Sequence, residues 1–118
     1  MIDRKTAETH AQSWISAWNE HDLAAVMAHY ADPLEFVSPL VIERLGRADG
    51  TIRDLADLRR YFAASLGPES DLRFDLEEVF VGVSSWAIVY RNHREQRVAE
   101  VETPNADGKI VKAVIHRL

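Results

Sequence analysis

Apolar residues in the first part of the chain recur every three or four positions. This spacing gathers them on one side of a helix, so it predicts an amphipathic helix over about residues 4–19. The residues of this stripe are Ala7, Ala11, Trp14, Ile15 and Trp18.

Two more helices are expected further along the chain. Asp22 suits the start of a short helix because its carboxylate can accept hydrogen bonds from the free amides of the first turn, and Asp32-Pro33 should end that helix. Asp54 or a neighbour caps a third helix, which Gly67-Pro68 ends. Between them, residues 34–38 predict a strand that ends before Pro39, and residues 40–53 predict a loop with room for one helical turn.

The second half of the chain changes to a period of two. Residues 72–76, 86–90, 97–103 and 110–118 alternate or are rich in strand-forming side chains, and turn sequences separate them at 82–84, 92–95 and 105–108. Helices followed by an antiparallel meander indicate an α+β fold. With 118 residues and no linker or repeat, we expect a single domain over residues 1–118.

Charge and composition exclude several classes of protein. The net charge is −5 and the basic residues are scattered, so nucleic acid is not expected as a partner. No apolar run approaches the ~20 residues that span a bilayer, and the first residues lack the apolar core of a signal peptide, so we expect no membrane association and a cytoplasmic location. The chain has no cysteine, which removes disulfides and thiolate chemistry.

Residues 97–103, RVAEVET, contain the main candidate for chemistry. In a strand, Val98, Glu100 and Glu102 share one face, while Ala99, Val101 and Thr103 share the other. The simplest interpretation sends Glu100 to water and the apolar trio to a core. The alternative turns Glu100 inward and buries a carboxyl group.

Several segments together resemble a known superfamily. They are WISAWNEHDLAAVMAHYADPLEFVSP, then LRRYFAASLG, then LRFDLEEVFVGV, then YRNHREQRVAEVETPNADGKIVKA. In this order they resemble the nuclear transport factor 2-like superfamily and its SnoaL-like branch, to which ketosteroid isomerase and polyketide cyclases are related. The resemblance implies a conical half-barrel, in which a curved mixed sheet wraps around three helices and encloses a deep apolar cavity. It also implies a homodimer through the convex face of the sheet, where Ala99, Val101 and Val114 would lie.

The resemblance also suggests which residues face the cavity. Glu100 matches the position at which ketosteroid isomerase keeps a neutral carboxylic acid. In that register Val98, Ala113, Ile115 and Arg117 share its face, and the wall is completed by Trp14, Trp18, Tyr30, Phe36, Ser38 and Phe62. The sequence departs from the isomerase at two positions, because Ser38 replaces its general base and Trp14 replaces its catalytic tyrosine, so that reaction is not expected here.

Three interpretations of function remain open at this stage. In the first, the cavity binds a small, largely apolar organic molecule, and Glu100 carries a proton in an isomerase, cyclase or dehydratase type of reaction that needs no cofactor, with Tyr30, Ser38 or Trp14 orienting an oxygen. In the second, the protein binds a ligand without turnover and Glu100 forms a structural ion pair with Arg117. In the third, large side chains fill the cone and the chain is a dimeric interaction module. The five histidines lack zinc-site spacing, so we expect no metal.

Overall fold

The structure of the protein, a computed structural model, describes all residues from 1 to 118. In chain order its elements are α1 (Arg4–Asn19), α2 (Leu23–Met27), β1 (Tyr30–Val37), α3 (Pro39–Leu45), β2 (Thr51–Ile52), α4 (Leu55–Ala63), β3 (Phe74–Val81), β4 (Trp86–Asn92), β5 (Arg97–Pro104) and β6 (Ile110–Arg117). None of the helices has the length and apolar character that crossing a membrane requires.

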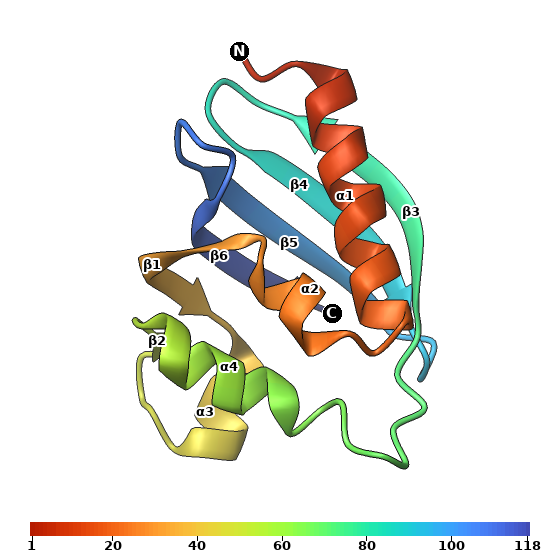
Figure 1. Cartoon of the computed structure of the whole chain (residues 1–118), viewed down its shortest axis with the longest axis vertical. Coiled ribbons are helices and arrows are strands. Elements are labelled where there is room, and N and C mark those ends of the chain that lie inside the picture. The colour runs from red at the N-terminus through yellow and green to blue at the C-terminus, as the bar shows by residue number, and fades with distance from the viewer.

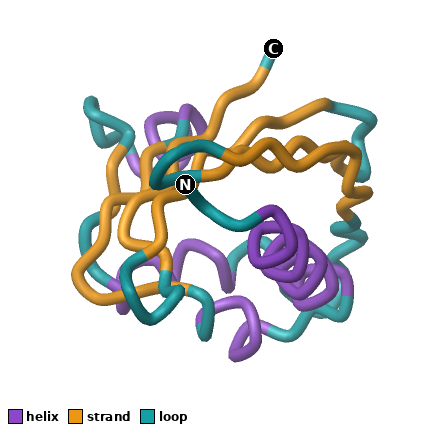
Figure 2. Tube along the Cα trace, turned by 90° about the horizontal axis from the view of Figure 1, so that it is seen from above, coloured by secondary structure: helices purple, strands orange, loops and turns teal.

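The six strands form one mixed sheet in the order β2-β1-β6-β5-β4-β3. Only β1 and β6 are parallel, and every other neighbouring pair is antiparallel. The sheet is strongly curved, with α1 lying across β3 and β4 and with α2 and α4 near β1 (Figures 1 and 2). The predicted α+β class is confirmed, and the curvature leaves a concave face toward these helices.

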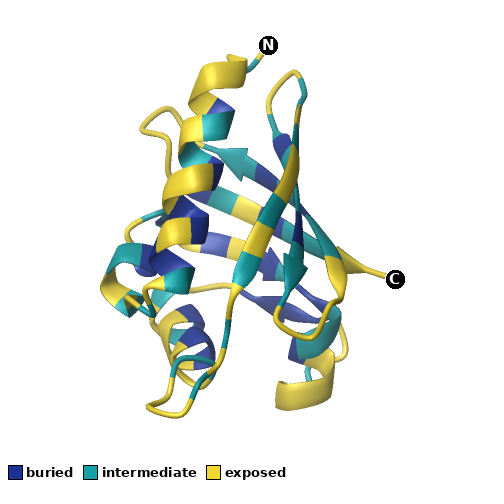
Figure 3. Cartoon of the chain, turned by 90° about the vertical axis from the view of Figure 1, so that its right-hand side faces the viewer, coloured by how far each residue is buried: buried dark blue, intermediate teal, exposed yellow.

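Aspartate caps begin three of the helices, and the sequence predicted two of them, Asp22 and Asp54. The side chain of Asp3 accepts a hydrogen bond from the Thr6 amide, and Asp22 and Asp54 cap α2 and α4 in the same way. The apolar stripe of α1 faces the sheet, while its outer side is exposed (Figure 3). The Asp3 cap sets where α1 begins, and the apolar stripe sets which side of α1 packs on the concave face.

The region between α2 and α4 differs from the sequence prediction. β1 begins at Tyr30 rather than at residue 34 and runs through Pro33. Pro33 is tolerated because β1 has no paired residue on β6 between Tyr30 and Glu35, so no ladder hydrogen bond needs its missing N–H. The segment predicted as a loop contains α3, which makes four helices rather than three.

Local sequence explains why α3 forms. Ser38 is its N-cap, Pro39 occupies the first turn, and Gly46 ends it in the left-handed conformation with φ of 67°. Ser38, predicted as the last residue of a strand, is therefore a helix cap. Its side-chain oxygen accepts a hydrogen bond from the Leu40 amide over 3.2 Å.

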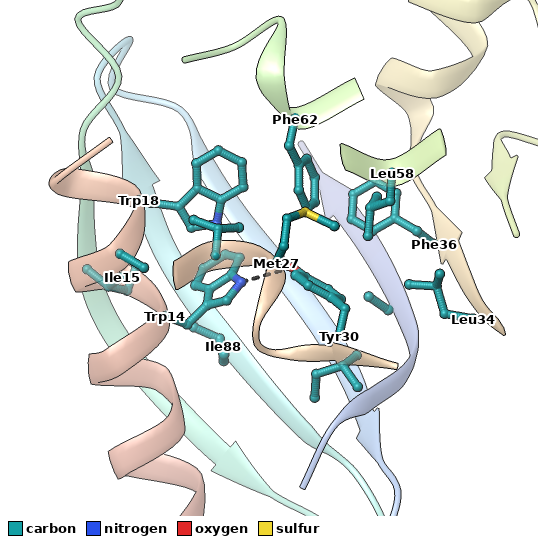
Figure 4. Packing of buried hydrophobic residues seen from close by; sticks show 14 of the residues in the cluster. Trp14, Ile15, Trp18, Met27, Tyr30, Leu34, Phe36, Leu58, Phe62 and Ile88 are labelled. Atoms are coloured by element: carbon teal, nitrogen blue, oxygen red, sulfur yellow. Dashed lines mark hydrogen bonds between the residues drawn. The ribbon is translucent and has the colours of Figure 1, made fainter. Parts of the chain in front are cut away.

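Aromatic side chains dominate the core between the helices and the concave face. Trp14 and Trp18 from α1, Phe62 from α4 and Tyr30 from β1 point toward one another (Figure 4). Such rings stabilise the fold mainly by the large apolar area that each removes from water. The core therefore ties α1 and α4 to the sheet on either side of the region where the cavity lies.

Candidate functional site

A cavity of about 860 Å³ lies between the concave face of the sheet and the helices. Its wall includes residues from α1, α3, α4, β4, β5 and β6, and exposed residues of the 64–72 segment and the β4–β5 turn lie at its rim. Ligand sites commonly enclose roughly 300–1,000 Å³. The cavity is thus large enough for a small organic molecule, so side chains do not fill the cone as the third interpretation requires.

Most of the residues expected at the cavity are found in its wall. Those that line it are Trp14, Trp18, Phe36, Ser38, Phe62, Val98, Glu100, Ile115 and Arg117. Tyr30 and Ala113 do not line it, although Ala113 is on the expected face of β6 and pairs with Glu102. Both are buried in the core, because neighbouring side chains cover them. The structure thus gathers the predicted residues, while their role in binding a substrate stays a prediction.

Glu100 points inward from the middle of β5. Its residue exposure is 4%, and it lies between Ile88 of β4 and Ile115 of β6 in the sheet. The hydroxyl of Tyr90 donates a hydrogen bond to its Oε1 atom over 2.7 Å, and its Oε2 atom has no partner. A buried carboxyl group with a single hydrogen bond is poorly compensated as an anion.

This environment raises the pKa of Glu100 well above the ordinary value for a glutamate. Burial is the largest cause, and the nearby charge of Glu102 is the next, while the hydrogen bond from Tyr90 acts in the opposite direction. A neutral carboxylic acid can donate its own proton to a hydrogen bond or to a base. Glu100 therefore has the chemistry of a general acid at the wall of the cavity.

Arg117 does not neutralise this acid. Its guanidinium pairs with Glu43 at the rim, where both side chains are about half exposed, at 48% and 51%. The expected ion pair between Glu100 and Arg117 is therefore absent. The terminal part of β6 lies closer to water than Glu100 does, and there the exposed Glu43 is the carboxylate that Arg117 meets.

The hydrogen-bonding atoms of three predicted orienting residues are already engaged. The indole N–H of Trp14 donates to the hydroxyl of Tyr30 over 2.9 Å, as the dashed line in Figure 4 shows. The oxygen of Ser38 caps α3. Trp14 and Ser38 thus serve the fold through these atoms, and Tyr30 lies outside the cavity wall.

Tyr90 is a site residue that the sequence analysis did not single out. It lines the cavity and donates to Glu100. Burial, followed by Glu100, raises the pKa of its hydroxyl well above the ordinary value, so Tyr90 stays protonated. The alternation of Trp86, Ile88 and Tyr90 together with the turn at 92–95 was the signal that could have placed it beside Glu100.

A second buried acid, Glu102, was also missed. Its side chain is fully buried, and its Oε1 atom accepts a hydrogen bond from the indole N–H of Trp86 over 2.9 Å. The Nε2 atom of His10 lies 2.9 Å from the same oxygen, although His10 is 92 positions away in sequence. Glu102 shares the face of Glu100 on β5, so strand periodicity was the available signal.

The fold brings His10 and His29 together, although they are far apart in the sequence. Their ring centres are 5.0 Å apart, and His10 also packs against Trp86 with ring centres 4.7 Å apart. Burial, followed by His10, lowers the pKa of His29. No group of three histidine or carboxylate side chains is arranged to hold a metal ion.

The chain belongs to the SnoaL-like domain family, whose pattern it matches over residues 11–115. It is similar to a SnoaL-like protein of unknown function from Burkholderia thailandensis, at 34% identity and a TM-score of 0.96, over 99% of this chain and 98% of the other. No curated protein matches it in sequence.

More distant structures share the fold alone. A protein from Agrobacterium tumefaciens, described as a candidate isomerase of the SnoaL-like family, is 18% identical with a TM-score of 0.74, over 97% of this chain and 98% of that one. A nuclear transport factor 2-like protein of unknown function from Cytophaga hutchinsonii is 11% identical with a TM-score of 0.75, over 100% and 95% of the two chains. The SnoaL-like family predicted from sequence is thus confirmed, and these distant structures confirm the fold.

Proposed function

We propose that this protein binds a small, largely apolar organic molecule in its cavity and that Glu100 supplies a proton in a reaction that needs no cofactor. Reactions of this kind include isomerisation, cyclisation and dehydration. The observation that carries the proposal is the buried carboxyl group of Glu100 in the wall of an aromatic cavity, in surroundings that favour its uncharged form.

The shape and lining of the cavity support a flat, apolar ligand with one oxygen near Glu100. Trp18, Phe62 and Phe74 present aromatic surface to the cavity. Apolar and aromatic walls bind by removing ligand surface from water, while a few polar groups set the orientation. Glu100 and its partner Tyr90 are buried polar residues of the sheet that line the cavity. A carbonyl or hydroxyl oxygen of the ligand would therefore lie beside them.

A second candidate function is ligand binding without turnover, and one observation favours it. The position of the isomerase general base holds Ser38 here, and the Ser38 oxygen is occupied as a helix cap. The site therefore offers an acid without a clear base beside it. In this case Glu100 would donate a hydrogen bond to the ligand and keep its proton.

A single labelled sample tests the binding step. Protein with carbon-13 in the glutamate carboxyl groups is titrated by NMR, with the Glu100 signal assigned through Glu100→Gln. At neutral pH this signal should be that of an uncharged acid, and adding 2-acetylnaphthalene, a flat ketone, should shift it while leaving that of the exposed Glu78 in place. An ionised Glu100, or a ketone that leaves its signal unchanged, overturns the proposal.

The same ketone separates the two candidate functions. When an acid donates its proton to the ketone oxygen and a water molecule removes a proton from the methyl group, the enol forms; its return to the ketone in deuterated solvent places deuterium on the methyl group. Catalysis predicts faster exchange with the wild-type protein than with Glu100→Gln, because glutamine binds through hydrogen bonds but transfers no proton. Binding of the ketone at Glu100 with equal exchange in both proteins identifies the non-catalytic function.

The proposal also includes a homodimer through the convex face. One row of apolar residues crosses this face through direct cross-strand pairs, and its members are Val37, Val114, Val101, Ala87 and Phe80. Phe80 is 53% exposed at the end of the row. An apolar band of this kind on a sheet surface suits a second copy of the same face.

Sedimentation at micromolar concentration tests the dimer. The wild-type protein should sediment as a dimer, and Val101→Lys, which places a charge in the row, should give a monomer. Val83→Lys is the matched control, because Val83 is 81% exposed in the turn between β3 and β4. A monomeric wild-type protein would contradict this part of the proposal.

A further inference from the structure

Two buried acids occupy the same face of β5 with one residue between them. Glu100 is 4% exposed and Glu102 is 0% exposed. Residues two apart on a strand point to the same side, about 7 Å apart along the backbone. Two carboxylates this close in a medium of low dielectric repel each other strongly, so ionisation of one opposes ionisation of the other.

The hydrogen-bond partners of the two acids differ. Glu102 Oε1 accepts from the Trp86 indole, which is only a donor, and lies 2.9 Å from His10 Nε2, which donates when it carries a proton. When His10 Nε2 carries a proton, two N–H groups meet one oxygen, and this arrangement suits a carboxylate, which only accepts. Glu100 has a single partner, the hydroxyl of Tyr90.

Basic side chains are also distributed unequally between the two acids. His10 lies on the Glu102 side, and His29 packs against it from the segment before β1. The hydroxyls of Tyr90, from β4, and Tyr61, from α4, lie near Glu100, while the hydroxyl of Tyr30, from β1, is influenced first by Glu102 and then by Glu100. Arg117, which lines the cavity, pairs with Glu43, and the ammonium group of Lys109 donates to the Ala28 carbonyl oxygen.

We propose that Glu102, held as a carboxylate by Trp86 and His10, is a positioning residue that keeps the proton on Glu100. Glu102 does not line the cavity, so it acts through Glu100 and not on the ligand. The pattern follows a general rule, since paired acids in unlike environments separate into one charged and one neutral group. The inference rests on the proposed function, in which Glu100 works in its neutral form.

Carbon-13 NMR on the full-length protein tests the inference through Glu102→Gln. Glutamine has the size of glutamate and can still accept from Trp86, but it removes the charge. The Glu100 signal should then titrate at lower pH than in the wild-type protein, and the pH at which ketone exchange declines should fall with it. Glu78→Gln, which removes an equal charge from an exposed position on β3, should leave the Glu100 titration in place.

The wild-type protein gives a second readout that needs no folded Glu102 variant. At a pH where Glu100 still shows the signal of an acid, Glu102 should already show that of a carboxylate. Glu100→Gln serves only to assign the two signals, because it removes that of Glu100, and the ionisation of both acids is then followed in the wild-type protein, where each influences the other. A neutral Glu102 at that pH overturns the inference.

The outcomes separate this inference from the proposed function. If Glu100 is ionised at neutral pH in the wild-type protein, the proposed function fails. If Glu100 is neutral there and titrates at the same pH with and without the Glu102 charge, the proposed function stands and the inference fails.

Discussion

Glu100 should make the stability of the protein fall as pH rises. Its native pKa is raised, first by burial and then by Glu102, so the folded protein keeps a proton that the unfolded chain has released. Between the unfolded and the native pKa, the unfolded state therefore binds fewer protons, and the free energy of unfolding declines with pH. This direction is opposite to that of an acid in a salt bridge, which stabilises the fold as pH rises.

The size and the pH range of the effect follow from the proton count. One proton held only by the native state changes the free energy of unfolding by about 1.4 kcal/mol for each pH unit. The decline begins near pH 4.3, which is about the value of an unfolded glutamate, and it ends at the raised native pKa. The contribution is fully present below that range and lost above it.

Urea denaturation at a series of pH values measures the effect. The difference in unfolding free energy between the wild-type protein and Glu100→Gln should slope downward from about pH 4.3, since the variant lacks the titrating proton. Contributions from all other groups cancel in this difference to the extent that the variant leaves them unchanged. Glu78→Gln is the exposed control and should give no such slope. Parallel stability curves for wild-type protein and Glu100→Gln would refute a raised native pKa.

Three further substitutions, and Gly46→Ala as a control for one of them, test the local structure around the site by thermal or urea denaturation. Gly50→Ala should lower the free energy of unfolding by more than about 1 kcal/mol, because Gly50 has φ of 64° and an added Cβ would lie 2.9 Å from the Ser38 carbonyl oxygen. Gly46→Ala should cost less, because Gly46 has a similar φ of 67° but no atom lies close to an added Cβ. Ser38→Ala should lose about 0.5–2 kcal/mol with the cap of α3, while 2-acetylnaphthalene still shifts the Glu100 signal. Tyr90→Phe should cost about 1–3 kcal/mol, because it leaves Glu100 without its only hydrogen bond.

Periodicity and caps were sufficient to predict most of the fold. The apolar stripe of α1 and the alternation in β4 and β5 depend on local spacing, which the sequence displays directly. The start of β1 was missed because Asp32-Pro33 was interpreted as the end of the preceding helix, and only the pairing pattern reveals that a strand can include Pro33, whose missing N–H is not needed. Ser38, Pro39 and Gly46 are ordinary start and stop signals for α3 and were available in the sequence.

The site was harder to predict because its contacts join distant parts of the chain. Alternation places Glu100 and Glu102 on one face but does not say whether that face meets water or the helices, and the family resemblance supplied the answer. The partner of Glu102, His10, is 92 positions away, so no local pattern identifies the pair. Arg117 lies opposite Val98 in the sheet, yet its guanidinium pairs with Glu43 of α3 at the rim of the cavity.

The two acids on β5 also show why stability and function need different explanations in this fold. The concave face around them holds Val98, Ile115 and Ala113, and apolar side chains in their place would satisfy the core without buried polar atoms. Each acid instead leaves one oxygen without a partner, which costs free energy. Departures from the apolar pattern of this kind concentrate at functional sites. Because Glu100 faces the cavity while Glu102 lies behind it, the unequal surroundings of the pair are best understood as serving the chemistry of Glu100.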